Sequence, residues 1–458
     1  MRISREFRYN RARQAWPDGA DARGLHGVLG ADVGFSERVK EIREGFAPAF
    51  WVANVTEMFE RLAYYAAFAS LANYLHSSLG FPTEQTASLS GIFGGLVWFL
   101  AIIGGAVADR LGFRRALSAA YLILTCSYFL LGSIGSSWMG PVRHAMPLFW
   151  MVLVILMLPA LGISMVKPAV VGTTARTSKE NVRSIGYSIY YTLVNVGGAA
   201  GPLVASVAHR HVGVQSVFRI AALSVLVMFF VVLLFFKEPR SSSDEQNRSV
   251  AQTVRNLGTV LANPKFMLFL TIFSGYWIVY WQVYIGLPLY ITGYINPHAN
   301  VELILVTDAA SVICLQIIIS YLTRKMRSFR AITIGTVITS LAWLIVAFRP
   351  TIFGAVAALF VVALGEMTLS PRYYEYVSRL APPGQQGTYM GFAFVPIGVG
   401  SLVGGWLMGH FLHHFGEIAH HPERAWWAMT GVGLVTALAL WIYDRSVTPK
   451  DSAAILTK

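Results

Sequence analysis

The chain has 458 residues, of which 55% are hydrophobic and only 13% carry a charge. A soluble domain usually carries about 25% charged residues, so the composition excludes an ordinary soluble enzyme and a disordered chain. The net charge of +13 would suit a nucleic-acid partner, but its distribution along the chain favours a membrane topology instead. We therefore expect the lipid bilayer as a partner and no nucleic acid.

Twelve stretches are expected to form transmembrane helices, because each span needs about 20 mostly apolar residues. No alternation typical of membrane-barrel strands is present in the sequence. The chain is therefore predicted to be an all-α membrane protein. The expected spans are 48–77, 84–108, 116–138, 147–173, 184–208, 216–236, 264–293, 301–322, 331–348, 351–370, 388–412 and 426–443.

The lysines and arginines between these spans favour one orientation in the membrane. If the N-terminus is cytoplasmic, the inside segments hold 29 of them and the outside loops hold 5. Cytoplasmic loops are rich in Lys and Arg, so we expect both termini in the cytoplasm of a bacterial-type inner membrane. The first 47 residues are polar and charged, which argues against a cleavable signal peptide. An amphipathic helix could form around Ser36–Glu44.

A weak repeat with a constant offset of 203 residues relates the two halves of the chain. Two pseudo-symmetric six-helix bundles are typical of transporters, whose substrate site lies near the midplane between them. Pairs at this offset include Pro168 and Pro371, Gly197 and Gly400, and Gly201 and Gly404. The expected segments are an arm (1–47), a first bundle (48–237), a polar linker (238–263), a second bundle (264–444) and a tail (445–458).

The first span carries three charges at bilayer depth. Glu57 lies roughly 14 Å into the span at 1.5 Å per residue, and it shares one helix face with Glu60, Arg61 and Tyr64. Each charge would cost about 2.5–3.5 kcal/mol against lipid, so this face must meet a polar interior. A static structural network is one interpretation. A proton or substrate relay is the favoured one, because intramembrane charges usually mark pathways.

Three more ionisable residues fall inside expected spans: Lys167 in the fourth, Asp308 in the eighth and Glu366 in the tenth. A Lys beside a Glu in a low dielectric offers a switch, since a proton on the Glu releases the Lys. The sequence does not show which acid Lys167 meets. It also leaves Asp308 without a role.

Several other patterns have structural readings of their own. Asp109, Arg110, Arg114 and Arg115 join the second and third spans and suit an ion-paired latch at a cytoplasmic helix end. The aromatic residues of the seventh span include Trp277 and Trp281. Two interpretations, that they line a cavity or that they face the core or the lipid, are equally favoured. Small-residue faces such as Gly197-x-x-x-Gly201 chiefly permit close helix packing.

A metal site is not favoured by the sequence. His410, His413 and His414 have a spacing that zinc ligands can adopt, but a solvated helix end is the better interpretation. Cys126 and Cys314 both lie in apolar runs, so neither a disulfide nor a cysteine-based metal site is expected. We expect no metal and no bound cofactor.

The Asp109–Arg115 motif, the twelve spans and the repeat resemble the major facilitator superfamily. More narrowly, Glu57-x-x-Glu60-Arg61-x-x-Tyr64-Tyr65 resembles the signature of the proton-dependent oligopeptide transporters. Further segments match that family in order along the chain: Lys167-Pro168, Tyr191 to Gly197, Gly365-Glu366, Leu380-Ala381-Pro382 and Met390-Gly391.

The resemblance implies proton-coupled uptake of small peptides by alternating access. It assigns proton coupling to Glu57, Glu60, Arg61, Lys167 and Glu366. It also implies that Glu366 receives the peptide amino terminus and that Asn195 binds the peptide backbone. Protons would then be the coupling ion.

The substrate pocket departs from that family. An Arg in the first helix and its Glu partner in the seventh helix are replaced here by Phe68 and Trp281. Losing both members of an ion pair avoids a stranded buried charge. A pocket Tyr of the second helix falls at Trp98. The expected substrate-binding residues are Tyr64, Tyr65, Phe68, Trp98, Asn195, Trp277, Trp281, Gln282 and Glu366.

The sequence thus predicts a monomeric proton-coupled symporter for small peptides or peptide-like zwitterions. A proton-coupled efflux antiporter for amphipathic compounds is the alternative, since Phe68, Trp98 and Trp281 would suit such cargo. A non-transporting sensor or scaffold is less favoured. A membrane enzyme is least favoured, because no catalytic constellation stands in a loop.

Overall fold

The structure is a computed structural model that describes residues 44–239, 258–381 and 386–446. Most of the arm and the tail, the centre of the linker and Pro382 lie outside the described residues. The amphipathic helix expected around Ser36–Glu44 falls there too, apart from Glu44 itself. All described regular structure is helical.

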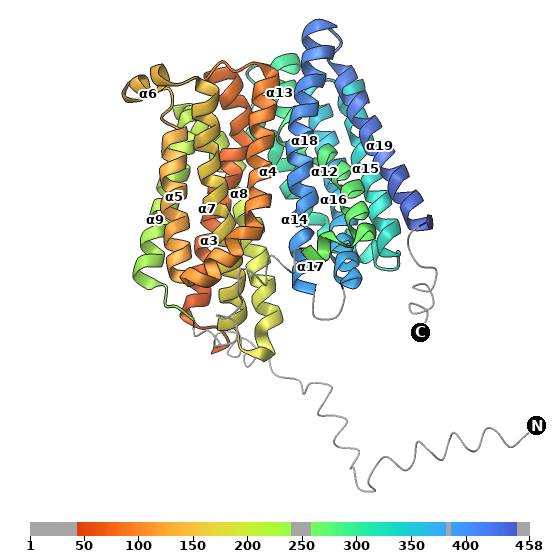
Figure 1. The fold of residues 1–458 in the computed structure, drawn as a ribbon. Helices are drawn as coiled ribbons and strands as arrows, with labels where there is room; N and C mark the ends of the chain where they lie inside the picture. The colour runs from red at the N-terminus through yellow and green to blue at the C-terminus, as the bar shows by residue number, and fades with distance from the viewer. Residues whose placement is uncertain (1–43, 240–257, 382–385, 447–458) are drawn as a thin grey trace, which may run out of the picture.

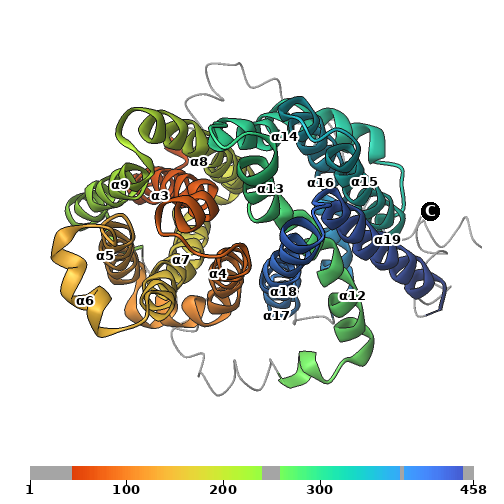
Figure 2. The ribbon, with the colours of Figure 1, turned by 90° about the horizontal axis from the view of Figure 1, so that it is seen from above.

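The first half of the chain forms six long helices that pack on one another (Figures 1 and 2). Pro48 is the first residue of the first of these helices, where its missing N–H costs no hydrogen bond. The six helices are α3 (Pro48–Asn73), α4 (Thr83–Leu111), α5 (Phe113–Leu131), α7 (Leu148–Thr177), α8 (Arg183–Val212) and α9 (Val214–Phe235).

The second half forms six more long helices, which also pack chiefly on one another. Short helical segments α6 (Gly140–Ala145), α13 (Gly286–Tyr290) and α17 (Gln386–Phe392) connect or extend the long ones. The six long helices are α12 (Pro264–Tyr280), α14 (Val301–Thr323), α15 (Ser328–Phe348), α16 (Ile352–Leu380), α18 (Val395–Phe411) and α19 (Glu423–Ser446).

The twelve long helices coincide with the twelve expected spans, so the all-α prediction is confirmed. By length and composition, nine helical segments of the described residues qualify as candidate membrane spans, and all nine lie from α7 onward. The helix α3 is also long enough, with 26 residues, but it carries Glu57, Glu60 and Arg61. These charges lower its hydropathy, and they are buried inside the protein.

Two glycines allow very short connections between antiparallel helices. Gly112 separates α4 from α5 with φ of 80°, and Gly213 separates α8 from α9 with φ of 104°. A side chain is strained at such positive φ, whereas glycine adopts it freely. Each helix pair is therefore closed by a single residue.

The sequence repeat has a counterpart in helix packing. Gly197 and Gly201 of α8 lie against the backbone of α3, where a Cβ atom on Gly201 would come within 2.6 Å of the Leu62 carbonyl oxygen. Gly400 and Gly404 of α18 lie against α12 in the same way, and a Cβ on Gly404 would come within 2.9 Å of the Ile278 carbonyl oxygen. Helix pairs at the same position in the two halves thus use the same small residues for close packing.

The two groups of helices meet along two seams, α4 against α18 and α8 against α14 (Figure 2). We call the end at which α3 ends and α4 begins the distal end, and the opposite one the proximal end. Among the described residues, side-chain hydrogen bonds between the two groups gather toward the distal end. They are Ser70 to Glu302, His209 to Glu302, Asn300 to Ser206, Thr83 to Glu417 and Ser401 to the Gly91 carbonyl.

Candidate functional site

A closed ion pair occupies the middle of α3. The Arg61 guanidinium donates to both carboxylate oxygens of Glu60, with Nε to Oε2 at 2.7 Å and Nη2 to Oε1 at 2.9 Å. Glu60 is fully buried and Arg61 is 8% exposed. A bidentate contact of this kind is the strongest arrangement for such a pair. The charge of Arg61 is therefore compensated by its own neighbour on the helix.

Glu57, one turn earlier on α3, has a looser environment. Its Oε1 accepts a hydrogen bond from the Tyr190 hydroxyl of α8 at 3.4 Å, and its Oε2 has no hydrogen-bond partner although it is buried. Arg61 and Lys167 are both close enough to act on it electrostatically. Glu57 is thus the acid of α3 that retains an unused acceptor.

Lys167 of α7 lies beside a stacked pair of aromatic rings and not against an acid among the described residues. Its Nζ is 5.2 Å from the ring centre of Trp98 on α4 and 5.0 Å from that of Phe394, which precedes α18. These two rings stack at 5.4 Å. No described carboxylate lies within ion-pair distance of Lys167, so cation–π contacts hold it across the seam between the helix groups. In this conformation Lys167 therefore forms no ion pair with Glu57 or Glu60.

In the second helix group, two acidic side chains contact the same tyrosine hydroxyl. The Tyr280 hydroxyl of α12 lies 3.1 Å from Oε2 of Glu366 on α16 and 3.5 Å from Oδ2 of Asp308 on α14. Asp308 is 4% exposed, and its Oδ1 has no hydrogen-bond partner. This contact is not predictable from the sequence, because three residues on three different helices meet only in the folded protein.

The replaced ion-pair positions of the sequence comparison face each other. Phe68 of α3 meets Trp281 edge to face at 5.3 Å and stacks on Tyr284 at 5.4 Å. The Trp281 indole N–H donates to the Ile397 carbonyl at 2.9 Å. Phe68 and Trp281 are 1% and 5% exposed, so the two helix groups close on each other here through apolar rings. A contact between both substituted positions fits the paired replacement seen in the sequence.

The expected substrate-binding residues divide by exposure. Four of them are partly exposed and could reach a bound molecule: Tyr65, Trp98, Asn195 and Glu366. Lys167, from the proton-coupling set, is also partly exposed. The others are buried in helix contacts: Tyr64, Phe68, Trp277, Trp281 and Gln282.

Some of the partly exposed residues lie near charged groups of both helix groups. Tyr65 is close enough to interact electrostatically with Arg61 on one side and with Asp308 and Glu366 on the other. Tyr191 of α8 also neighbours Glu366, yet it is 64% exposed. Glu366 thus has an exposed neighbour on the first helix group, proximal to the closed Phe68–Trp281 contact.

At the α4–α5 turn, where an ion-paired latch is expected, the described contacts involve Arg114 and Glu238. Asp109 lies on α4, and its side chain is outside the described part of the chain. Arg114 donates from Nη2 to the Leu233 carbonyl at 2.6 Å. The carboxylate of Glu238, after α9, accepts the backbone N–H groups of Phe113 and Arg114, both at 2.7 Å. An acid at a helix N-terminus compensates the free N–H groups there, and the sequence analysis had not singled out Glu238. Arg110 and Arg115 are exposed.

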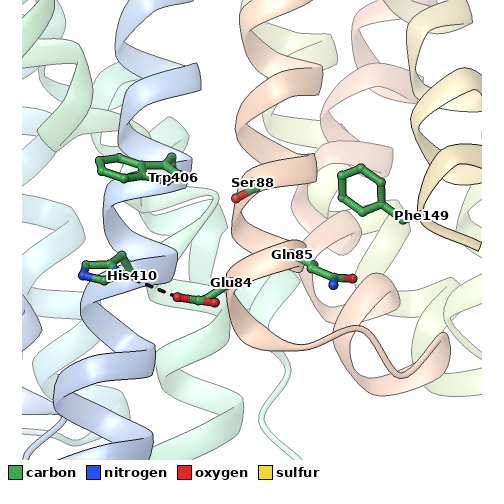
Figure 3. A pocket seen from close by; sticks show the side chains of 6 residues that line it. All are labelled: Glu84, Gln85, Ser88, Phe149, Trp406 and His410. Carbon is green, nitrogen blue, oxygen red and sulfur yellow. Dashed lines mark ion pairs between the residues drawn. The ribbon is translucent and has the colours of Figure 1, made fainter.

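The histidine-rich end of α18 forms ion pairs with acids instead of a ligand cluster. His413 lies 2.7 Å from Glu417, and His410 lies 3.6 Å from Glu84 of α4. Within the described residues, no three metal-binding side chains come together. A pocket of about 410 Å³ opens beside this contact at the α4–α18 seam, and Figure 3 shows its six lining residues: Glu84, Gln85, Ser88, Phe149, Trp406 and His410.

Comparison with known proteins identifies the family from the sequence and finds solved structures with a similar fold. A model of the Major Facilitator Superfamily matches residues 54–395 and 295–456. The multidrug resistance protein MdtH of Salmonella typhimurium (strain LT2) is 22% identical over 403 residues, which are 86% of this chain and 94% of that protein.

Two solved structures have a similar fold. A POT family transporter in complex with 5-aminolevulinic acid matches with a TM-score of 0.72 and 16% identity, over 87% of this chain and 96% of that one. A peptide transporter POT in complex with sulfate matches with a TM-score of 0.67 and 19% identity, over 87% and 95% of the two chains. At these identities the similarity establishes the fold.

Proposed function

Because the chain belongs to the major facilitator superfamily, we propose that it is a proton-coupled symporter for small peptides or peptide-like zwitterions. The observation that carries the proposal is a pair of partly exposed charged groups, one in each helix group, that form no ion pair within the described part of the chain. Lys167 has no acid partner in the first helix group, and Glu366 has no basic partner in the second, among the described residues. A zwitterion would supply a carboxylate to one and an ammonium to the other.

A short chain of side-chain contacts links Lys167 to Glu366 across the two helix groups. Lys167 contacts the Phe394 ring, and that ring lies 6.3 Å from the ring of Tyr374. Tyr374 in turn is an electrostatic neighbour of Glu366 and Tyr65. The complex of a fold relative with 5-aminolevulinic acid, a compound with one amino and one carboxyl group, supports cargo of this chemical class.

The proton is proposed to act at Glu57. While ionised, Glu57 attracts the nearby Lys167 and competes with a cargo carboxylate for its charge. A proton on Glu57 removes that competition, so proton and cargo bind together. Glu60 would keep Arg61 compensated throughout, because the bidentate pair is already complete. Proton coupling would thus depend on Glu57 and Lys167, with Glu60 and Arg61 as a fixed support.

The experiment is uptake into liposomes that contain the purified protein. Radiolabelled dialanine and 5-aminolevulinic acid serve as probes, and a pH gradient with an acidic outside is imposed. We expect both probes to accumulate only with the gradient and to stop when a protonophore collapses it. Uptake that is indifferent to the gradient would contradict the proposal.

A second function has support of its own. The MdtH relatives carry the name of multidrug resistance proteins, and the buried rings of Phe68, Trp281 and Tyr284 would suit an amphipathic drug once the two helix groups part. Efflux in exchange for protons would then replace symport. Expression in a drug-sensitive bacterial strain tests this alternative, which predicts raised resistance that Lys167→Ala removes.

The orientation and location are part of the proposal. An excess of Lys and Arg at the proximal end would place both termini in the cytoplasm of an inner membrane. The described contacts between the helix groups gather at the distal end, so this conformation would open toward the cytoplasm. A reporter enzyme that is active only outside the cytoplasm, fused after Lys458, would stay inactive if this orientation is right.

A further inference from the structure

The acids Asp308 and Glu366 form a cluster that proton coupling through Glu57 does not use. Both have an oxygen within 3.5 Å of the single hydroxyl oxygen of Tyr280. That hydroxyl carries one proton, so it can donate to one carboxylate at a time. The other carboxylate then has no donor from Tyr280.

Within the described ranges, no basic side chain compensates these two acids. The groups that face Asp308 from the helices around it are Glu366 on α16, Tyr276 and Tyr280 on α12, Tyr284 beyond it and Tyr65 on α3. Among the described residues, no lysine, arginine or histidine acts on either acid. Two neighbouring carboxylates in a buried site cannot both ionise without a large energetic cost, so such pairs share a proton.

The surroundings of the two acids differ in a way that decides where the proton resides. Asp308 is 4% exposed, its Oδ1 lacks any partner, and its contact with Tyr280 is the longer one at 3.5 Å. Glu366 is partly exposed and has the shorter contact at 3.1 Å. A charge on Asp308 would therefore be less solvated and less hydrogen-bonded than a charge on Glu366.

We propose that Asp308 is a second proton-binding residue of the transporter and holds a proton while the site is open. Glu366 then presents a single negative charge, which matches cargo with one ammonium group. When Asp308 loses its proton to water, the site carries two negative charges. It then attracts a second cation more strongly than it accommodates the uncharged part of the cargo. The identity of the cargo rests on the proposed function, whereas the protonation of Asp308 is independent of it.

The first test needs no cargo. Infrared spectra of the purified protein at neutral pH should contain a carbonyl band of a protonated carboxyl group that is absent from Asp308→Asn. The matched control is Glu375→Gln, which removes another acid of the second helix group that already has Arg372 and Arg379 as partners. That change should leave the band in place. A band of equal intensity in Asp308→Asn, or no band in the natural protein, would overturn the proposal.

The second test uses exchange of labelled dialanine across liposomes at equal pH on both sides. In the natural protein the exchange rate should fall at alkaline pH as Glu57 and Asp308 both lose protons. In Asp308→Asn the fall should be less steep, with a slope of log rate against pH that is smaller by about one, because asparagine has no proton to lose. Glu366→Gln should lower exchange at every pH.

The two tests separate the two proposals. If dialanine is not transported at all but the band behaves as expected, the proposed cargo is wrong and the protonation of Asp308 stands. If transport occurs and the slope of Asp308→Asn equals that of the natural protein, Asp308 is not a coupling residue. Elution of each variant as a single peak in size-exclusion chromatography shows that it is folded.

Discussion

In the first helix group the buried charges balance, whereas in the second they do not. Glu57 and Glu60 face Arg61 and Lys167, two acids against two bases. Asp308 and Glu366 face only tyrosines among the described residues. Where glycines of α8 approach Arg61 on α3, the repeat-related glycines of α18 approach Trp277 on α12. Repeat-related helices have thus kept their packing and changed their chemistry.

This difference separates two roles for buried charge. A balanced set can remain ionised without cargo, and it stabilises the fold as long as no member is removed. An unbalanced set needs a proton or a bound cation from outside. The first helix group therefore has a complete ion pair at its centre, whereas the two acids of the second have no basic partner among the described residues. The following predictions test this contrast.

The largest effect is expected from Glu60→Gln, which leaves Arg61 buried without its partner. Stranding one member of a buried ion pair costs roughly 3–5 kcal/mol of unfolding free energy. Chemical denaturation in detergent micelles measures it. Asp444→Asn is the control, because its partner Arg327 is largely exposed and the 3.6 Å contact should contribute less than about 1 kcal/mol. Equal losses in both variants would show that the pair at the centre of α3 has no special role.

A second change to the same pair sharpens that result. Glu60→Gln combined with Arg61→Gln should recover much of the lost stability, because no uncompensated charge remains. Gradient-driven uptake should stay low in both variants. Recovery of uptake together with stability would mean that this pair is not needed for transport.

Lys167→Ala should nearly abolish gradient-driven uptake while changing stability little, because no ion pair is lost from the protein. Truncating one member of a charge pair with the cargo costs roughly 2–5 kcal/mol. At tenfold per 1.4 kcal/mol, this is a loss in affinity of about 30-fold or more. Exchange at saturating cargo should persist. Lys179→Ala, with the same charge change at an exposed position, should transport normally. Normal uptake by Lys167→Ala would remove the main support for the proposed function.

A smaller effect is expected at the distal end from Glu302→Gln. Oε1 of Glu302 lies 2.8 Å from Nδ1 of His209 and accepts from Ser70 at 3.0 Å, so it ties α14 to both α8 and α3. Losing hydrogen bonds to a charged group costs roughly 1.5–3 kcal/mol, which would shift the population toward distal opening. Distances between spin labels on the distal ends of α8 and α14 should lengthen. Glu423→Gln is the control, because its partner His421 lies in the same helix group. An unchanged distance distribution in Glu302→Gln would mean that this contact does not hold the distal end closed.

The smallest effect is expected from Tyr280→Phe, which removes the hydroxyl between the two acids. Both contacts are long, so the loss should be roughly 0.5–1.5 kcal/mol in cargo binding, measured as the half-saturating concentration of dialanine. The buried Tyr373, whose hydroxyl donates to the Ala393 carbonyl, provides the control variant Tyr373→Phe. A larger loss for the control would indicate that any buried tyrosine has this effect.

Much of the architecture was predictable because the bilayer imposes it locally. A helix that crosses the membrane needs a long apolar run, so the expected spans and the observed long helices agree, and the predicted superfamily is confirmed. The repeat at Gly197 and Gly400 likewise predicted close packing, since small residues are required wherever backbones approach. The roles of the site residues remain predictions.

The sequence by itself determined which residues are charged at membrane depth, and that such charges must face the interior of the protein. It did not determine their partners. Arg61 pairs with its neighbour Glu60 rather than with a distant residue, Lys167 rests on aromatic rings, and Asp308 meets Glu366 through Tyr280. The contacts of Lys167 and Asp308 join helices far apart in the chain, so only the tertiary arrangement decides them. The physical reason is that the apolar length of a span is encoded in one continuous segment, whereas charge compensation depends on side chains that several helices bring together.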